Sequence, residues 1–591
     1  MDFRTEHPRP EAFREDWISL NGVWNFEIDN DKVGIDGGYE KRTSFSKKIN
    51  VPFCPESKLS GIANTDFMSA VWYAREINIP TEWRKKRVLL HIEACDYATR
   101  VYINGILVGS HKGGYTPFKF DITPFLSDSK NYVTIYAEDD TRSKRQASGK
   151  QSERQGSYGC FYTRTTGIWQ SVWLEAVNAA RIEKYHTLPN ITDASVCVNT
   201  DVTEAALGAT LSLKAVYDGK TVGAVTTRVT SRRVCTSIKL DELHLWELGD
   251  GRLYDLVFEL SDGEVLDTVK GYFGMREVFL RRDGFYLNGK RVFGRFVLDQ
   301  GFYPDGIYTA PSDEALIYDI KASMALGFNG ARLHQKVFEP RFLYHADRLG
   351  YMVFGETASW GLDWTEPTCI YDFLPEWIEE VERDMSHPSI IGWCPFNETW
   401  DLYGRRHCND FINMFYYVTR AIDPSRLIVT NSGSYPTTDV KNTTSDTHDV
   451  HDYEQDPEKL REYYAHIDEG LVNCQLMRMD PSRQHYDPDK PIFVSEYGGI
   501  KWVEGEMEQN GKNDESSWGY GNNVRSEDEF FARLKGLTDV LLDNERIFAF
   551  CYTQLTDVEQ EQNGLYTYDR KHKFDLAVLH AIISRKSVVE D

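Results

Sequence analysis

The stretch Ser386-His-Pro-Ser-Ile-Ile-Gly-Trp-Cys-Pro-Phe-Asn-Glu-Thr-Trp400 decides the fold of the C-terminal half of the chain. The apolar run that begins at Ile390 predicts a buried parallel strand, and this strand ends on Asn397 and Glu398. A carboxyl group at the end of a buried strand is costly to desolvate unless it has a partner or a task. The stretch therefore predicts a functional acid where the strand leaves the core.

A second stretch has the same design and helps to define the architecture around it. In Pro491-Ile-Phe-Val-Ser-Glu-Tyr-Gly-Gly499 an apolar strand delivers Glu496 at its C-terminal end. From about residue 275 onward, predicted strands alternate with amphipathic helices, which is typical of a TIM (β/α)8 barrel. The predicted strands span 292–298, 330–333, 352–355, 390–396, 427–430, 447–451, 492–495 and 547–555. The predicted helices span 312–326, 339–349, 372–385, 410–421, 457–467, 527–544 and 575–584, and the connection after the fifth strand has no well-defined helix.

The N-terminal half of the chain is predicted to be all β. Short alternating runs separated by Gly, Pro, Asn and Asp turns indicate a jelly-roll, galactose-binding-like sandwich at residues 1–180. Further strands at 181–274 fit an immunoglobulin-like sandwich. With the barrel at 275–591, we expect a multidomain chain of three domains. The polar stretch from Asp140 to Arg164 is too polar for a strand, and we expect it to lie near the active site.

Composition excludes several classes of partner. The formal net charge of -24 argues against nucleic acid and anionic membrane surfaces, because both require clustered Lys and Arg. The first ten residues lack the features of a signal peptide, and no apolar run approaches the roughly 18 to 20 residues of a membrane helix, so we expect a cytoplasmic protein. Ten Cys without a Cys-x-x-Cys pair indicate reduced, mostly buried thiols rather than a disulfide frame or a zinc site.

Two strand-end glutamates that face each other suggest glycoside hydrolysis. Retaining glycosidases use one carboxylic acid to protonate the leaving oxygen and a second carboxylate, about 5 to 5.5 Å away, as nucleophile. Two acids this close tend to raise the pKa of one of them, which keeps the proton donor loaded. We assign Glu398 as acid/base and Glu496 as nucleophile, although chemistry alone leaves the order of the two roles open.

Other polar and aromatic residues near the predicted strand ends are candidates for substrate binding. They are Asp299, Arg332, His334, Asn397, His451, Tyr453 and Trp518. Asp299 has a competing interpretation as a strand-end cap, and Trp518 and Trp502 are equally compatible with a sugar platform and with packing. His448 and His451 form a His-x-x-His pair, but we expect core packing for His448 and substrate contact for His451 rather than a metal.

The whole chain resembles family 2 of the glycoside hydrolases. The resemblance rests on motifs in a fixed order: Leu20-Asn-Gly-Val-Trp-Asn-Phe26, Phe285-Tyr-Leu-Asn-Gly-Lys290, Leu326-Gly-Phe-Asn-Gly-Ala-Arg332, His387-Pro-Ser-Ile-Ile391, Asn397-Glu398 and Ser495-Glu-Tyr-Gly498. It implies that Glu398 is the acid/base, that Glu496 is the nucleophile, and that Asn397 is similar to a residue that contacts the sugar 2-hydroxyl. It also implies a carbohydrate substrate and a homo-oligomer.

Departures from the family pattern bear on substrate and cofactor. Family glucuronidases bind the sugar carboxylate with an Asn-x-Lys element, and Glu561 and Asn563 stand in its place here. A second acid would repel a uronate, so a neutral glycoside is favoured. Arg332-Leu-His-Gln335 replaces an Arg-x-Ser-His motif. Magnesium-dependent relatives carry a Glu-x-His that Glu356-Thr-Ala-Ser-Trp360 lacks, so we expect no metal and no cofactor.

The leading hypothesis is therefore a retaining exo-β-glycosidase, most specifically a β-galactosidase. A β-glucuronidase or another β-glycosidase of the family is the alternative within the class. A carbohydrate-binding protein that has lost catalysis is the alternative from a different class. The presence of both Glu398 and Glu496 argues against it, because a degenerate site usually loses one of its acids.

Overall fold

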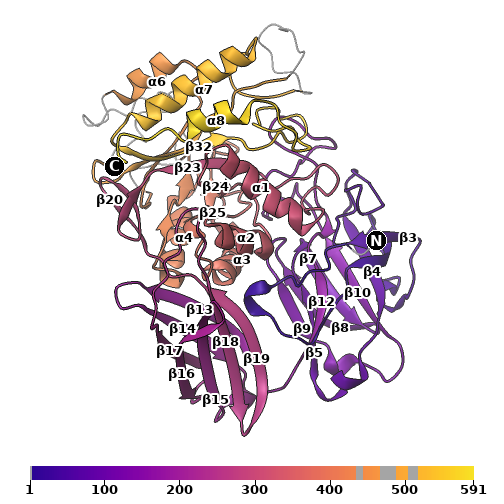
Figure 1. The fold of residues 1–591 in the computed structure, drawn as a ribbon. Helices are drawn as coiled ribbons and strands as arrows, with labels where there is room; N and C mark the ends of the chain where they lie inside the picture. The colour runs from indigo at the N-terminus through magenta and orange to yellow at the C-terminus, as the bar shows by residue number, and fades with distance from the viewer. Residues whose placement is uncertain (1–2, 434–442, 466–486, 504–516, 591) are drawn as a thin grey trace.

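The computed structural model describes residues 3–433, 443–465, 487–503 and 517–590. Figure 1 shows two β-sandwiches, in indigo to magenta, packed beside a strand-and-helix body in dark red to yellow. This arrangement confirms the expected architecture of a jelly roll, an immunoglobulin-like sandwich and a TIM barrel.

The jelly roll is built from two antiparallel sheets that enclose one apolar core. The larger sheet has the order β3 (Lys47–Val51), β2 (Gly22–Ile28), β4 (Ala70–Ile77), β10 (Asn131–Glu138), β7 (Ala98–Ile103), β8 (Ile106–Lys112). The smaller has the order β1 (Trp17–Ser19), β12 (Val172–Val177), β5 (Arg87–Ile92), β9 (Phe118–Asp121), and β6 (Cys95–Asp96) pairs with β11 (Gly167–Ile168). Phe26, Leu90 and Ile135 are fully buried between the sheets.

The immunoglobulin-like sandwich follows the same rule of alternation. One sheet has the order β13 (Ile182–Asn190), β14 (Ser195–Val202), β17 (Arg233–Lys239), and the other β16 (Lys220–Arg228), β15 (Thr210–Tyr217), β18 (Tyr254–Asp262), β19 (Glu264–Phe273). Along β14, Val196, Val198, Thr200 and Val202 are buried while the alternate residues are partly exposed. This period of two is what packs one face of each sheet against the other.

The third domain carries an eight-stranded, all-parallel sheet that curls into the barrel. Its order is β28 (Leu427–Ile428), β26 (Ile390–Cys394), β25 (Met352–Glu356), β24 (Gly330–Leu333), β23 (Gly294–Asp299), β32 (Ile547–Thr553), β31 (Ile492–Gly498), β30 (His448–Asp452). The short strands β27 (Phe396–Asn397) and β29 (Asn431–Ser432) pair beyond β26 and β28. The Ser432 hydroxyl meets the His451 ring, which links β29 to β30 where the order returns to its start. All eight predicted strands are present.

Helices surround the barrel at the positions that the sequence predicts. They are α1 (Asp313–Ala325), α2 (Pro340–Leu349), α3 (Ile370–Asp384), α4 (Asn409–Ile422), α6 (Pro457–Tyr464), α7 (Glu527–Leu542) and α8 (Leu576–Ile583). The poorly defined connection after the fifth strand falls largely on residues 434–442, outside the described residues. A hairpin sheet of β20 (Val278–Arg281), β21 (Gly284–Leu287) and β22 (Lys290–Val292) packs Phe285 against the inner barrel residue Phe296.

Alternation along the barrel strands sorts side chains into two layers. On β23, Phe296 and Leu298 belong to the inner cluster, while Val297 belongs to the cluster shared with the helices. The same phase turns Arg332 on β24 inward between Ala331 and Leu333, which face the helices. Side chains of the inner phase at the C-terminal ends therefore line the barrel mouth.

The polar loop of the jelly roll lies against the barrel, as predicted. The N–H of Ser148 donates to the carbonyl of Trp360 (2.9 Å), and that of Gly149 donates to the carbonyl of Ala358 (3.1 Å). Ala358 and Trp360 follow β25, so the loop reaches the segment just beyond a strand end. Residues from a separate domain thereby become part of the barrel mouth.

The nine described cysteines are free thiols, in agreement with the prediction, and five of them are buried. Cys474 lies outside the described residues. Within the described ranges, none of the helices has both the length and the apolarity needed to cross a lipid bilayer.

Candidate active site

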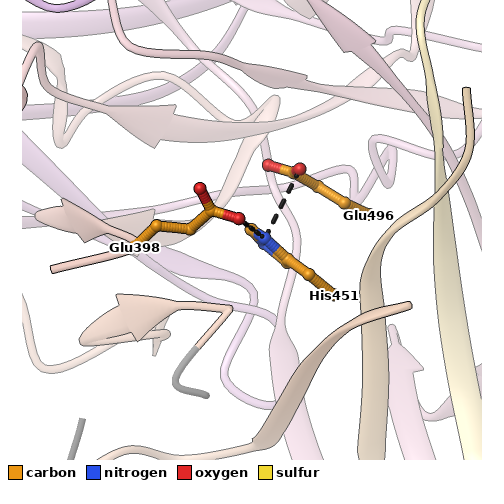
Figure 2. A group of neighbouring side chains, drawn as sticks. All are labelled: Glu398, His451 and Glu496. Carbon is orange, nitrogen blue, oxygen red and sulfur yellow. Dashed lines mark hydrogen bonds and ion pairs between the residues drawn. The ribbon is translucent and has the colours of Figure 1, made fainter. Parts of the chain in front are cut away.

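The two predicted glutamates meet at the mouth of the barrel. Glu398 follows β27 in a left-handed backbone conformation (φ +46°), and its N–H donates to the carbonyl of Ser432 (2.9 Å). Glu496 lies on β31 among fully buried neighbours. One carboxylate oxygen of each and a ring nitrogen of His451 all lie within 4.8 Å of one another. Figure 2 shows both carboxylates converging on the same ring nitrogen of His451, Nδ1.

His451 joins the two acids electrostatically. Its Nδ1 atom lies 2.7 Å from Glu398 Oε1 and 3.4 Å from Glu496 Oε2, while Nε2 lies 2.9 Å from the Ser432 hydroxyl. Burial lowers the pKa of His451, but the negative charges of Glu496 and Glu398 outweigh burial and raise it. A proton is therefore retained at Nδ1, between the ring and the acids.

Arg332 fixes the relative positions of four strand ends. Its guanidinium pairs with both carboxylate oxygens of Glu356 (2.5 and 3.2 Å). It also donates to the Ser495 carbonyl (2.7 Å), to Glu496 Oε1 (3.2 Å) and to Asn397 Oδ1 (3.1 Å). A planar fork with five donors suits this geometry. Glu356 thus orients Arg332, and Arg332 in turn holds Asn397 and Glu496.

Glu496 is held in its ionised form. Burial raises the pKa of this carboxyl, but the positive charges of His451 and Arg332, among others, set it at about 2. The hydroxyl of Tyr453 donates to its second oxygen, Oε2 (2.5 Å). The environment of Glu398 differs, because its side chain is 17% exposed against 6% for Glu496. The pair is asymmetric, with one acid ionised and the other more accessible.

An aromatic stack extends from Tyr453 along one side of the pocket. The ring of Tyr453 stacks on Tyr520 with centroids 3.5 Å apart and an interplanar angle of 4°, and Trp518 meets Tyr520 edge-on at 4.8 Å. Trp518 thus stands two rings away from Glu496, and its role as a sugar platform stays a prediction. Trp502 packs against Phe574 (5.9 Å), which favours the packing interpretation for that residue. Sequence reasoning missed Tyr520.

Of the other predicted residues, His334 lies beside Glu496, whereas Asp299 lies apart from the two paired acids. His334 Nε2 is 3.9 Å from Glu496 Oε1, and burial together with neighbouring positive charges lowers the pKa of the ring, so it is neutral. Asp299 alternates with the inward-facing Leu298 on β23, so its side chain faces away from the barrel interior and lies near Asp319. Its carboxylate accepts a hydrogen bond from the N–H of Gly301 (2.9 Å). Asp299 therefore lies apart from the paired acids, which favours its strand-end interpretation.

A buried polar network adjoins the pocket, and sequence reasoning found only part of it. Glu561 accepts from the hydroxyl of Tyr162, a residue of the jelly-roll loop, and from the amide of Asn563 (3.1 Å). Gln554 donates to Asn563 Oδ1 (2.8 Å), and Gln300, the residue after Asp299, donates to Gln554 (2.8 Å). The sequence singled out Glu561 and Asn563 from their place in a motif, but it did not single out Gln300.

Lys150 is the second residue that the jelly-roll loop supplies, and it too was missed. It is 5% exposed, and its ammonium lies 5.6 Å from the ring centroid of Trp360 and 5.9 Å from that of Tyr162. The indole N–H of Trp360 donates to the carbonyl of Asn397 (2.8 Å). Lys150 therefore lies between Trp360, which hydrogen-bonds to the residue before Glu398, and Tyr162, the partner of Glu561.

Glu398, His451 and Glu496 are also a donor set that fits a divalent metal by distance. The raised pKa of His451 favours its protonated form, which has no free lone pair, and Nδ1 is already hydrogen-bonded to Glu398. Electrostatics thus favour a proton at this position. That no metal is required stays a prediction.

Two β-sandwiches and a barrel whose mouth holds paired acids define a class of multidomain TIM-barrel proteins. The comparisons with family models agree along the chain. Residues 17–175 match the sugar binding domain of the glycosyl hydrolases family 2, residues 180–276 match a second model of that family, and residues 280–585 match its TIM barrel domain. The chain belongs to glycosyl hydrolase family 2.

Named relatives carry two different activities in their names. A β-galactosidase of Thermoanaerobacter pseudethanolicus is 26% identical over 82% of this chain, which spans only 60% of that protein. A β-glucuronidase of Streptococcus agalactiae is 23% identical over 81% of this chain and 82% of the relative. The solved β-glucuronidase of Ruminococcus gnavus in complex with D-glucuronic acid superposes with a TM-score of 0.77 at 18% identity, covering 98% of this chain and all of the other. This last likeness establishes the fold alone.

Proposed function

We propose that this protein is a retaining exo-β-glycosidase that releases a single terminal sugar. The observation that carries the proposal is the approach of one oxygen of Glu398 to one oxygen of Glu496 within 4.8 Å. A nucleophile and an acid/base that share one anomeric carbon need this short separation, whereas inverting enzymes place their acids about 6.5 to 9.5 Å apart to admit a water. The jelly-roll loop that lies against the barrel mouth favours a pocket for one sugar over an open cleft.

The asymmetry of the pair assigns the two roles. Glu496, ionised and held by Arg332 and Tyr453, attacks the anomeric carbon, and the glycosidic bond breaks as Glu398 gives its proton to the departing oxygen. A glycosyl ester on Glu496 results. Glu398, now a carboxylate, takes a proton from water, the water oxygen bonds to the anomeric carbon, and Glu496 leaves. His451, with Nδ1 at 2.7 Å from Glu398 Oε1, orients this carboxyl group toward the leaving oxygen.

The glycone that we favour is neutral, with galactose first. Glu561 is a buried carboxylate in the place where family glucuronidases carry Asn, and it would face the acid group of a uronate. The similarity to a named β-galactosidase supports this choice. The similarity to several named β-glucuronidases supports a glucuronide as the second candidate. A purely sugar-binding role would not need an ionised Glu496 beside a protonated His451.

The proposal is tested with two isosteric variants and a substrate panel. Nitrophenyl β-galactoside, glucuronide, mannoside, xyloside and arabinoside identify the best glycone for the unaltered protein. On that substrate we expect Glu496→Gln to lower kcat by at least about 1000-fold, or roughly 4 kcal/mol of transition-state stabilisation. Glu398→Gln should slow substrates with poor leaving groups most, and azide should partly restore its rate by replacing the deprotonated water.

Glu462→Gln on the exposed face of α6 is the matched control, since it makes the same change away from the pocket. It should behave as the unaltered protein does. Undiminished turnover in Glu496→Gln, or no hydrolysis of any glycoside by the unaltered protein, would overturn the proposal.

A further inference from the structure

We propose that Lys150, supplied by the jelly-roll loop, is a specificity-determining residue of the glycone pocket. Together with Glu561 it binds neighbouring hydroxyls of a neutral sugar and disfavours a uronate. The inference rests on the proposed function, because it concerns how the same pocket chooses its sugar.

The loop fixes the backbone on both sides of this residue. The N–H of Gly149 donates to the carbonyls of Ala358 and Trp360, and the carbonyl of Lys150 accepts from the N–H of Tyr162 (2.7 Å). These bonds tie Lys150 to the barrel on one side and to the second arm of its own loop on the other. The side chain then extends between the rings of Trp360 and Tyr162. Its position is set by backbone hydrogen bonds and not by the flexible stem alone.

The ammonium faces three carboxylates without pairing to any of them. Glu561 acts on it most strongly among these acids, followed by Glu496 and Glu398, and together they raise the pKa of Lys150 despite its burial. Yet among the residues that the structure describes, no ion pair within 4.0 Å and no side-chain hydrogen bond satisfies this ammonium. The residue is 5% exposed, and its Nζ atom is not among the fully buried unpaired polar atoms of the described residues, so a ligand can reach it. A sugar hydroxyl in the pocket would supply the missing acceptor.

Glu561 is the complementary group, and it is rigid. Tyr162 and Asn563 each donate to one of its oxygens, and Gln554 and Gln300 extend the network behind Asn563. A carboxylate has about four acceptor sites, so sites remain for a ligand after these two bonds. Lys150 offers donors and Glu561 offers acceptors, and Tyr162 links the two residues. Adjacent sugar hydroxyls, each a donor and an acceptor, match such a pair.

The charge of the pair decides between neutral and acidic sugars. One ammonium and one carboxylate cancel, so a neutral glycone meets no excess field, and a uronate gains no net attraction to offset the desolvation of its charge. Family members that act on uronates would need a net positive charge here. The catalytic acids bind the anomeric end of the ring, which leaves this pair for the hydroxyls on the opposite side.

The test is a double-mutant cycle measured on matched nitrophenyl glycosides, the best neutral glycoside and the corresponding uronide. Lys150→Met removes the cation and should lower kcat/KM for the neutral glycoside about 10- to 100-fold, which is the effect of one hydrogen bond to a charged group. Glu561→Gln leaves the cation unbalanced and should raise the ratio of uronide to neutral kcat/KM at least tenfold. The double variant should lose that gain, since the pair is uncharged again.

Lys144→Met serves as the matched control on the same loop. Lys144 is partly exposed and pairs with Glu153 at the surface, so its loss changes net charge equally without touching the pocket. It should leave both kcat/KM values unchanged. Circular dichroism and thermal unfolding check that all four variants fold.

Two results would overturn the inference. One is an unchanged neutral kcat/KM in Lys150→Met, and the other is a folded Glu561→Gln variant whose uronide ratio does not rise. Either result, seen while Glu496→Gln remains inactive, rejects the role of Lys150 and leaves the glycosidase intact. Activity in Glu496→Gln would instead reject the proposed function on which the inference rests.

Discussion

The carboxylate of Glu496 is surrounded by groups that stabilise its negative charge. Arg332 and His451 come from β24 and β30, and Tyr453 follows β30. Each donor lies on a strand end or directly after one, so its direction is fixed by the barrel. Because no group has to move when charge shifts during the reaction, the site is preorganised in the sense that electrostatic catalysis requires.

Tyr453→Phe tests this stabilisation through the pH dependence of kcat/KM. Glu496 must be ionised to attack, so activity falls as the pH drops through its pKa, which is about 2 in the intact site. Loss of the hydroxyl donor destabilises the carboxylate and raises this pKa, so the acid limb should move to higher pH by about one to two units. An acid limb that stays in place would contradict the role of Tyr453.

Tyr497→Phe is the control for that measurement. Tyr497 follows Glu496 directly, but its hydroxyl meets Thr538 of α7 (2.9 Å) on the helix side of the barrel. This variant also removes one phenolic hydroxyl, but from the face of β31 opposite to Glu496. Its pH profile should match that of the unaltered protein.

At the level of single residues, the sequence predicted the acids but not all of their neighbours. Glu398 and Glu496 end apolar strands, and that context marks them. Asp299 directly follows the apolar run Phe296-Val-Leu298, and a run that is apolar at consecutive positions does not show which side chains point into the barrel. Lys150 was missed because a lysine in a polar loop of another domain has no local signal that separates it from a solvated one.

Among the elements, the barrel strands were the easiest to predict and the loops the hardest. Buried parallel strands have a strong apolar signal, and the amphipathic helices α2, α3 and α4 have a clear period. A loop without periodicity reveals its target only through contacts such as those of Ser148 and Gly149 with the segment after β25. The sequence could suggest that residues 140–164 reach the active site, but not which residue enters it.

Gly149→Ala tests whether the loop must lie against the barrel. Gly149 has φ +55°, and a methyl group there would lie 2.2 Å from the carbonyl oxygen of Gln335. The substitution should push the loop, and Lys150 with it, away from the pocket. We expect kcat/KM to fall about tenfold or more, which corresponds to roughly 1.4 kcal/mol.

Gly156→Ala is the matched control within the same loop. A methyl group on Gly156 meets no atom within 4 Å, and its backbone does not need the left-handed region. Its kcat/KM should equal that of the unaltered protein. Equal losses in both variants would mean that the loop tolerates no change anywhere, and equal retention would mean that its contact with the barrel is unimportant.

In the whole molecule, interactions between domains hold the loop in place. Arg14 pairs with Glu175 of the jelly roll (3.0 Å) and with Asp267 of the immunoglobulin-like domain (2.9 Å). The N–H of Tyr115 in the jelly roll donates to Glu376 on α3 of the barrel (2.8 Å). These buried contacts join all three domains, consistent with the close packing in Figure 1. The pocket therefore depends on the assembled chain and not on the barrel alone.

The central claim is that Glu496 forms a covalent intermediate with the anomeric carbon of the sugar, and that Glu398 assists both the formation and the hydrolysis of this intermediate. Two successive displacements restore the original configuration, whereas a single displacement by water inverts it. The most direct test is proton NMR of the sugar first released from a β-glycoside, recorded before mutarotation equilibrates the anomers. The account predicts that the β-anomer appears first. Initial release of the α-anomer would contradict it.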